Sequence, residues 1–381
     1  MKELKECVVW RGSRHESVYD SVCIPGLVVT NKGTLLAYAE ARDHINIPEG
    51  LWIDWAPIDI VMKRSTDGGK TWSETKVLCN GTDASKPGGV RTTNNPVMFV
   101  DGDIVHMLYN TWYSLEKSKN DRGWDGGVFY IKSIDDGLTW SDPKDISASC
   151  HTDEFPRALL ATGPGHGIVL SEKSKNPGML LVPIWLTPES NTNSEKNKAT
   201  DHQNPVASSL YSLDKGETWK IGEIIFPTEE ITDPNETAAV ELSDGSIMFN
   251  MRTPSLLKRR AVTVSETGYS GWSTPRFEQN LPDPICFASI IRYDKDTILF
   301  VNCANEGMGV DDWLTRRINL TVRASRDDGK TWEASRVLVP GKAGYSDIAV
   351  GPDGMIYVLY DIDHGDTSMN LLSFDLDWIY G

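Results

Sequence analysis

The stretch Ser65-Thr-Asp67-Gly-Gly-Lys-Thr-Trp72 decides the fold, because its pattern, Ser-x-Asp-x-Gly-x-Thr-Trp, occurs four times along the chain. The other copies are Ser133–Trp140, Ser212–Trp219 and Ser325–Trp332, and a degraded fifth is Ser265–Trp272. Successive serines of the five are 68, 79, 53 and 60 residues apart. A recurrence of this kind indicates a repeat architecture in which each repeat is one supersecondary unit. The spacing suits a four-stranded sheet with loops of variable length.

Each copy of the motif predicts a tight hairpin turn. The Asp and Ser side chains accept hydrogen bonds from nearby backbone N–H groups, Gly takes a positive φ angle, and Trp packs beneath the turn. Short apolar runs flank turn residues, as strands should, namely Gly26–Thr30, Thr34–Tyr38, Ile58–Met62 and Ile356–Tyr360. Long amphipathic helical patterns are absent. We therefore predict an all-β propeller, with antiparallel blades around a central axis.

The same pattern predicts how the chain is organised. No linker separates one part of the sequence from another, so we expect residues 1–381 to form a single propeller domain. The last stretch, Leu371–Ile379, is expected to pair with N-terminal strands and close the ring. Turn motifs of this kind stabilise structure and carry no chemistry, so the function has to be argued from other residues.

The composition narrows the class of partner. Of the 381 residues, 39% are hydrophobic and 24% charged, which is ample for a large core and unlike a disordered chain. The formal net charge is -16. A protein this acidic is repelled by nucleic acid and by anionic membrane surfaces. We expect neither as a partner, and the composition leaves the oligomeric state open.

The cysteines and the N-terminal residues bear on compartment and cofactors. Six cysteines lie far apart, with no Cys-x-x-Cys pair and no metal-ligand spacing to the seven histidines. We interpret them as reduced thiols, and we predict no metal and no cofactor. Met1–Trp10 lacks the apolar core of a signal peptide, and no stretch approaches the ~20 apolar residues of a membrane span. The sequence as given predicts a cytoplasmic protein, or a secreted or periplasmic one if a signal peptide has been removed.

Five segments together resemble the sialidase (neuraminidase) superfamily, whose turn motif is the Asp-box or BNR repeat. They are Cys23–Arg42, Thr162–Gly167, Asn235–Arg252, Arg317–Arg323 and Ala343–Asp347. The likeness extends over nearly the whole chain. It implies a six-bladed β-propeller of four-stranded antiparallel blades, and an exo-glycoside hydrolase that acts on a glycan or oligosaccharide.

The resemblance also implies the catalytic residues. Tyr345 and Glu236 match the family's nucleophile pair, in which a neutral phenol activated by a carboxylate avoids repulsion from the carboxylate that the sugar carries. Asp43, Asp54 and Asp59 all precede the first turn motif, and Asp54 matches the family's acid/base. A solvated loop aspartate and a core or rim tyrosine are the structural alternatives. Asp59 lies within an apolar strand and is interpreted as a structural partner.

Substrate-binding residues follow from the same resemblance. Arg252 and Arg317 match the second and third arginines of the family's carboxylate clamp, where a planar guanidinium suits bidentate binding. Either could instead be an ordinary surface charge. Arg42 and Glu40 match positions of the first blade that line the pocket beside the acid/base. Trp55 is a candidate stacking face for a sugar, with burial beneath its loop as the alternative.

The first arginine of the clamp is missing, because Cys23 stands where the family has arginine. Asp361 stands where the family has the glutamate that supports that arginine. In the family the residues at these two positions contact one another. A change of both therefore indicates a substrate-binding subsite that has been reorganised. Three interpretations remain: a hydrolase of sialic acid or a related acidic sugar, a hydrolase of the same fold acting on a different sugar, and a carbohydrate-binding propeller without turnover. The presence of Asp54, Glu236 and Tyr345 together disfavours the third, because binding alone needs no activated phenol. We take the first as the prediction, with the second as its alternative.

Overall fold

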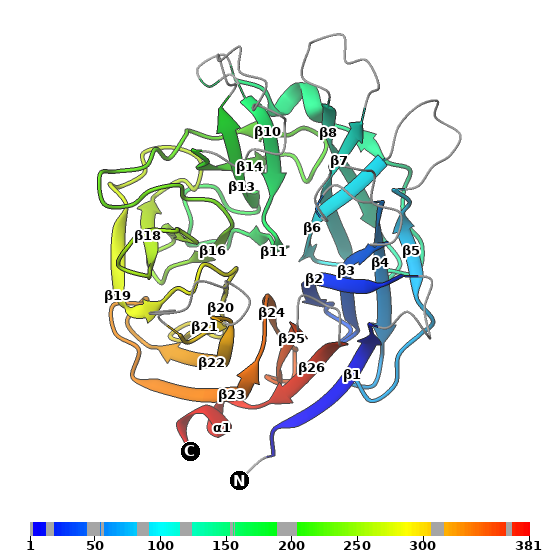
Figure 1. The fold of residues 1–381 in the computed structure, drawn as a ribbon, viewed down its shortest axis with the longest axis vertical. Helices are drawn as coiled ribbons and strands as arrows, with labels where there is room; N and C mark the ends of the chain where they lie inside the picture. Colours follow the sequence, from blue (N-terminus) through cyan, green and yellow to red (C-terminus); the bar gives the residue numbers. More distant parts are fainter. Residues whose placement is uncertain are drawn as a thin grey trace.

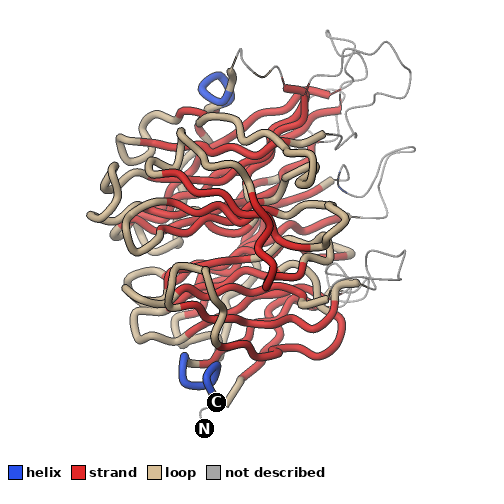
Figure 2. The backbone as a smooth tube through the Cα atoms, turned by 90° about the vertical axis from the view of Figure 1, so that its left-hand side faces the viewer, coloured by secondary structure: helices blue, strands red, loops and turns tan. Residues whose placement is uncertain are grey.

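The computed structural model shows blades of β-sheet arranged in a ring around a central axis (Figure 1). It describes residues 3–12, 19–43, 54, 57–81, 91–114, 124–152, 155, 157–188, 204–305, 316–362 and 368–381. Viewed from the side, the strands run across the molecule between two faces (Figure 2). The prediction of an all-β propeller is confirmed.

Strand pairing among the described residues divides the ring into six groups. Each group has four strands that run in chain order from the axis outward, except that the sixth takes its outermost strand from residues 5–11. The groups are β2 (Ser21–Val29), β3 (Leu35–Arg42), β4 (Ile58–Ser65) and β5 (Lys76–Cys79); β6 (Arg91–Asp101), β7 (Ile104–Ser114), β8 (Trp124–Ser133) and β9 (Lys144–Asp145); β10 (Arg157–Thr162), β13 (Leu180–Pro188), β14 (Val206–Ser212) and β15 (Lys220–Ile221); β16 (Thr237–Glu241), β17 (Ile247–Met251), β18 (Arg259–Ser265) and β19 (Arg276–Pro282); β20 (Ser289–Arg292), β21 (Ile298–Cys303), β22 (Ile318–Ser325) and β23 (Ala334–Lys342); and β24 (Ser346–Val350), β25 (Ile356–Ile362), β26 (Ser368–Phe374) and β1 (Lys5–Arg11).

A few short elements complete the list. The first two blades share one sheet, because β4 and β6 pair through Ile58 and Thr92. Strand β11 (Gly165–His166) pairs with β6, and β12 (Ile168–Val169) pairs with β13. The helices are η2 (Ser147–Cys150) and α1 (Leu376–Tyr380), and no helix in the described ranges is long and apolar enough to cross a membrane.

The ring closes through β1 and β26. These strands pair antiparallel from Lys5 opposite Ser373 to Arg11 opposite Ser368, which confirms the predicted pairing between the two ends of the sequence. The strand ends earlier than predicted, because Leu376–Tyr380 is helical. Asp375 starts this helix by accepting a hydrogen bond from the backbone N–H of Trp378 at 2.9 Å, as an N-cap aspartate does.

One buried carboxylate joins the blades at the axis. Asp347 of β24 accepts from His166 Nδ1 at 2.7 Å and from Ser289 Oγ at 2.7 Å, and its second oxygen accepts from the N–H of Leu27 at 2.8 Å. Asp347 is fully buried. Burial acts to lower the pKa of His166, but the Asp347 carboxylate raises it above its usual value. Residues from four different parts of the ring therefore share one charged centre.

The four intact motifs form the turns that the sequence predicts. Each turn begins at the last residue of the third strand of its blade. In every copy the Ser Oγ donates to the Asp Oδ1 at 2.8–2.9 Å and accepts from the Gly N–H at 2.8–2.9 Å. The Thr N–H donates to the same Asp at 2.8–2.9 Å. In the degraded copy, Ser265 Oγ accepts from the N–H of Gly268 at 3.0 Å and from the N–H of Thr267 at 3.1 Å.

The fourth position of the motif, which the pattern leaves variable, reaches the preceding blade. Asp136 accepts from Thr34 Oγ1 at 2.7 Å and from Arg64 Nη2 at 2.8 Å. Asp328 accepts from Ser243 Oγ at 2.5 Å on the preceding blade and from Arg292 Nη2 at 2.6 Å on its own. These side chains cross-link neighbouring blades at the face where the turns lie.

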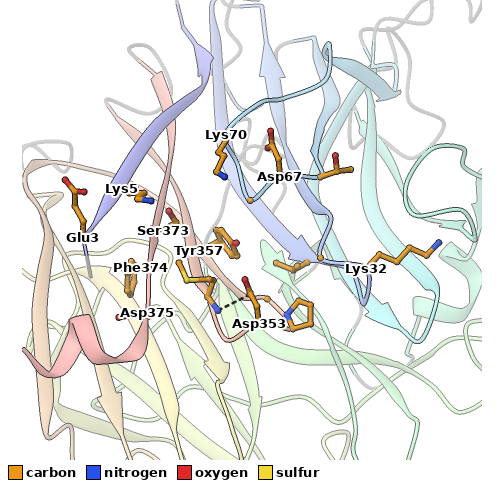
Figure 3. Close-up of a pocket in the computed structure, with 17 residues that line it drawn as sticks. Glu3, Lys5, Lys32, Asp67, Lys70, Asp353, Tyr357, Ser373, Phe374 and Asp375 are labelled. Carbon is orange, nitrogen blue, oxygen red and sulfur yellow. Dashed lines mark hydrogen bonds between the residues drawn. The ribbon is translucent and has the colours of Figure 1, made fainter. Parts of the chain in front are cut away.

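The first motif has Gly68 at this fourth position, and a cavity of about 720 Å³ lies there (Figure 3). The cavity sits between the turn at Asp67–Lys70 and the β24–β25 turn at Gly351–Met355, with Tyr357 and Lys32 on its walls. A glycine offers no side chain to bridge the two blades. The seam between the sixth and first blades is therefore less filled than the seams that Asp136 and Asp328 cross.

Substituting Asp328 with alanine is expected to lower the free energy of unfolding by about 2 kcal/mol, because hydrogen bonds to a charged group contribute about 1.5–3 kcal/mol. Burial acts to raise the pKa of Asp328, but the Arg292 and Ser243 donors hold it below its usual value. A depressed pKa means that the contribution is present above about pH 4 and is lost as the pH falls further.

Thermal unfolding of the wild-type and Asp328→Ala proteins between pH 2 and pH 7 measures this effect. Asp296→Ala is the matched control, since the Asp296 carboxylate lies on the surface, 3.6 Å from Lys295 Nζ. A difference between wild type and Asp328→Ala that stays constant down to pH 2 would contradict the assignment.

Candidate functional site

Strand direction gathers the candidate residues at one face of the ring. The first strands of the blades start at this face and the second strands return to it, so side chains at β-strand starts and ends meet there. Glu236 directly precedes β16, Arg252 follows β17, Arg317 precedes β22 and Tyr345 precedes β24. Arg42 is the last residue of β3. The turn motifs lie at the opposite face, at the ends of the third strands.

Tyr345, Glu236 and Arg252 form one hydrogen-bonded group. The Tyr345 hydroxyl donates to Glu236 Oε1, and Arg252 Nη1 donates to Glu236 Oε2. Arg252 Nη1 also donates to the Tyr345 hydroxyl oxygen at 2.5 Å. The phenol thus has a carboxylate that can take its proton and a guanidinium that can stabilise the oxygen as that proton leaves.

Arg317 covers the ring of the same tyrosine. Its guanidinium carbon lies 5.0 Å from the centre of the Tyr345 ring, and its Nη2 donates to the carbonyl oxygen of Ile285 at 3.0 Å. Tyr345 is 4% exposed and Arg317 also 4%. Burial raises the pKa of Tyr345 well above its usual value, although Arg252 and Arg317 act to lower it. The phenol is therefore neutral at rest, and Glu236 is the carboxylate placed to accept its proton.

The second group comes from the first blade. Arg42 donates from Nε to Glu40 Oε2 at 2.9 Å and from Nη1 to Asp54 Oδ1 at 2.7 Å. Glu40 is fully buried, and its other oxygen accepts from the N–H of Asn95 at 2.7 Å. Burial raises the pKa of Glu40. The Asp54 side chain is 45% exposed, so one carboxyl oxygen is held by Arg42 while the group remains open to water or to a ligand.

Cys23 and Asp361 lie together and are both fully buried. Cys23 packs in a core cluster with Ile24, Phe287 and Tyr345. Asp361 Oδ1 accepts from the N–H of Tyr345 at 3.0 Å. Within the described residues, Asp361 Oδ2 has no hydrogen-bond partner. The two residues therefore form part of the floor beneath the tyrosine.

Asp361 connects the two groups electrostatically. Burial raises its pKa to about 7, while Arg317 and Arg42 both act to lower it. Cys23 likewise experiences the charges of Arg42, Glu40 and Asp54, with burial raising its pKa most. Asp361 and Cys23 thus lie within electrostatic range of Arg42, and Asp361 also bonds the backbone of Tyr345.

The other candidate residues of this segment, Asp59, Asp43 and Trp55, differ in where they lie. Asp59 is buried and accepts from the Tyr19 hydroxyl at 2.6 Å and from the N–H of Gly81 at 2.6 Å, which agrees with the structural role predicted for it. Asp43 adjoins Arg42, and its N–H donates to the carbonyl of Pro57 at 3.3 Å. Trp55 lies outside the described residues, and its stacking role stays a prediction.

Sequence reasoning missed a buried ion pair next to the site. Arg260 and Asp283 are both fully buried, with Arg260 Nη1 3.2 Å from Asp283 Oδ2. The available signal was an arginine at the start of the apolar run Ala261–Ser265. A charge that enters a strand of this kind has to find a buried partner.

Comparison with known proteins places the chain in a family. Residues 56–358 match the family model described as a BNR repeat-like domain. A sialidase of Micromonospora viridifaciens is 32% identical over 376 residues, which cover 94% of this chain and 52% of that protein. A sialidase of Bacteroides fragilis (strain YCH46) is 28% identical over 376 residues, which cover 92% of this chain and 62% of that protein. The chain thus spans between about half and two thirds of the length of these two relatives.

Solved structures show the same fold. The Hadza microbial sialidase Hz136 has a TM-score of 0.75 at 25% identity, and the match covers 95% of this chain and 67% of that one. A leech intramolecular trans-sialidase complexed with 2,7-anhydro-Neu5Ac has a TM-score of 0.72 at 18% identity, covering 98% and 71%. From the turn motifs, the ring of blades and these matches, we conclude that the chain belongs to the sialidase superfamily of BNR-repeat propellers.

Proposed function

We propose that the protein is a sialidase-like retaining exo-glycoside hydrolase that removes a terminal sialic acid or a related acidic sugar. The observation that carries this proposal is the hydrogen-bonded group of Tyr345, Glu236 and Arg252. Binding a sugar requires no activated phenol. A phenol between a carboxylate and a guanidinium is instead arranged to lose its proton while it attacks an electrophilic carbon.

In the first half-reaction, the Tyr345 oxygen attacks the anomeric carbon and the bond to the leaving oxygen breaks. Glu236 takes the phenol proton, and the carboxylic acid form of Asp54 gives a proton to the leaving oxygen. The product of this step is a glycosyl group bound to Tyr345. A neutral nucleophile suits a sugar that bears a carboxylate at the reacting carbon, because an anionic one would be repelled.

In the second half-reaction, Asp54 takes a proton from a water molecule as that water attacks the same carbon. The bond to Tyr345 breaks, and Glu236 returns the proton to the phenol oxygen. Arg42 Nη1 donates to Asp54 Oδ1 at 2.7 Å and so holds the carboxyl group in place for this proton transfer. Two displacements at one carbon retain its configuration.

Arg252 and Arg317 are proposed to bind the sugar carboxylate. Both guanidinium groups lie beside Tyr345, close to the carbon that the phenol would attack. Cys23 provides no third charge, so recognition of the carboxylate falls on two arginines. We expect Arg317→Ala to raise KM for an acidic aryl glycoside about 10- to 100-fold, since a hydrogen bond to a charged group is worth about 1.5–3 kcal/mol.

A panel of aryl glycosides tests the proposed function directly, with sialosides beside uronides and neutral sugars. The proposal expects turnover of sialosides by the wild type and a selective KM increase for acidic substrates with Arg317→Ala. An equal loss on acidic and neutral substrates would contradict the carboxylate assignment.

A different sugar is the second candidate, and the buried Cys23 and Asp361 favour it. By the sequence resemblance, these residues stand where the family has an arginine and its supporting glutamate, and neither carries a positive charge. Turnover of neutral sugars or uronides in the same panel, without turnover of sialosides, would select this candidate. Binding without any turnover would select a carbohydrate-binding propeller.

A further inference from the structure

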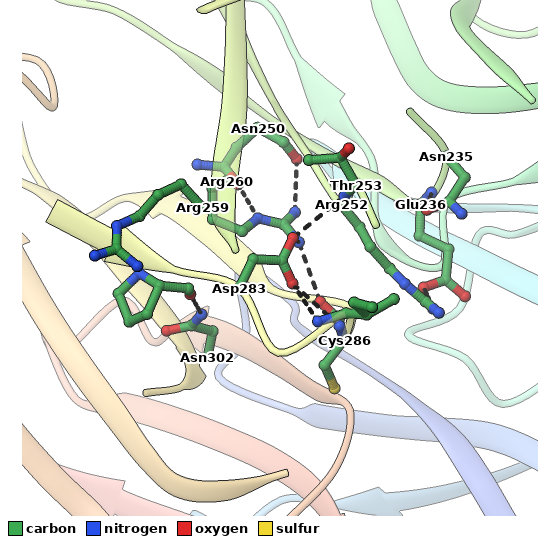
Figure 4. Close-up of polar contacts among 12 residues, drawn as sticks. Asn235, Glu236, Asn250, Arg252, Thr253, Arg259, Arg260, Asp283, Cys286 and Asn302 are labelled. Carbon is green, nitrogen blue, oxygen red and sulfur yellow. Dashed lines mark hydrogen bonds and ion pairs between the residues drawn. The ribbon is translucent and has the colours of Figure 1, made fainter. Parts of the chain in front are cut away.

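The buried ion pair of Arg260 and Asp283 lies between the core of the fourth blade and the candidate site (Figure 4). Arg260 donates from Nε to Asn250 Oδ1 at 2.6 Å and from Nη2 to the Asn250 carbonyl at 3.0 Å. Its Nη1 also donates to the carbonyl of Cys286 at 3.0 Å. The arginine therefore joins β17 to the segment that follows β19.

Asp283 holds the backbone on both sides. Its Oδ1 accepts from the N–H groups of Ile285 at 2.8 Å and Cys286 at 3.2 Å, and its Oδ2 accepts from the N–H of Thr253 at 3.2 Å. Ile285 has a φ angle of 62°, which a β-branched residue adopts only when its surroundings impose it. The carboxylate supplies part of that constraint.

These contacts reach the immediate surroundings of two candidate substrate-binding arginines. Thr253 adjoins Arg252, and the carbonyl of Ile285 is the group to which Arg317 Nη2 donates at 3.0 Å. The buried pair of Arg260 and Asp283 thus fixes the backbone next to Arg252 and the carbonyl group that binds Arg317.

We propose that Arg260 and Asp283 are positioning residues that fix Arg252 and Arg317 relative to one another, and thereby set the affinity for the carboxylate of an acidic sugar. This inference rests on the proposed function. Bidentate recognition tolerates little displacement of its donors. A buried ion pair is, by contrast, a weak source of net stability, because desolvation of both charges offsets their attraction.

The test compares Asp283→Asn with a matched control, Arg323→Lys. Arg323 is a buried arginine in the third strand of the next blade, and its Nη1 donates to Asn302 Oδ1 at 3.0 Å, as Arg260 does to Asn250. Among the described residues it has no carboxylate partner, and burial lowers its pKa to about 10. It lies toward the turn-motif end of its strand, away from the candidate site.

Binding of free N-acetylneuraminic acid is measured by calorimetry, together with kcat, KM and the unfolding midpoint of each variant. We expect Asp283→Asn to raise Kd and KM about 10-fold or more. The Arg323→Lys protein is expected to bind like wild type even where its unfolding midpoint falls by a similar amount. Equal weakening by both variants, or wild-type binding by Asp283→Asn, overturns the inference.

Two further measurements keep the inference separate from the proposed function and from misfolding. If the wild type neither binds nor cleaves acidic sugars, the proposed function has failed, and crystal structures of wild type and Asp283→Asn decide the inference. Displaced guanidinium groups of Arg252 and Arg317 support it, and unchanged positions overturn it. If Asp283→Asn does not fold, the apolar double variant Arg260→Met with Asp283→Leu takes its place in every measurement, with the same expected results.

Discussion

Replacing Tyr345 with phenylalanine is expected to lower kcat by at least about 10³-fold, because removal of a catalytic nucleophile leaves only binding and electrostatic contributions. The substitution deletes one oxygen and keeps the ring, which packs 5.7 Å from the Phe287 ring and beneath the Arg317 guanidinium. The fold should therefore persist. Glu236 and Arg252 still pair with one another in the variant, so no buried charge is left alone.

The measurement combines steady-state kinetics with intact mass spectrometry of rapidly quenched reactions. Wild type is expected to carry one glycosyl unit during turnover, and Tyr345→Phe none. Tyr360→Phe is the matched control: it too removes a buried hydroxyl, one that donates to Glu6 Oε1 at 2.5 Å between the β25 and β1 strands. Activity of Tyr345→Phe within about tenfold of wild type would remove Tyr345 from the mechanism.

Asp54→Ala is expected to lower kcat by about 10²- to 10⁴-fold on substrates with a poor leaving group, which is the usual contribution of general acid–base catalysis. The loss should be smaller for aryl glycosides of acidic phenols, because their leaving oxygen needs no proton. The variant should also lose the decline in rate at high pH that comes from deprotonation of the acid.

A series of aryl glycosides with phenols of different acidity, assayed across pH, measures both effects. Asp43→Asn serves as the control, since Asp43 lies next to Arg42 on the same segment. If Asp54→Ala slows all leaving groups equally, the residue acts only through its contact with Arg42 and not as an acid.

The fold was predictable because its signal is local and repeated. Each turn motif contains its own hydrogen-bond donors and acceptors, so Ser65 and Asp67 specify their turn without help from distant residues. The helix at Leu376–Tyr380 was missed, since it depends on a single capping residue, Asp375. The cross-link from Asp328 to Ser243 of the preceding blade was also invisible, because that contact joins residues 85 positions apart.

Residues of the candidate site could be predicted only where their segments resemble a family with known chemistry. The resemblance pointed to Tyr345 and Glu236, and the structure brings them into contact. The complete burial of Cys23 depends on how residues from other blades pack against β2, which the sequence does not specify. Arg260 and Asp283 were missed for the same reason, because pairing of buried charges depends on which strand ends meet in space.

The pairing of β1 with β26 has a consequence for folding. The two strands, 5–11 and 368–374, are separated in sequence by all the other blades of the ring. Because loop-closure entropy has to be overcome before so distant a contact forms, we expect this pairing to form late. Until it forms, the outer edge of β26 is unpaired, and such edges invite pairing with other chains.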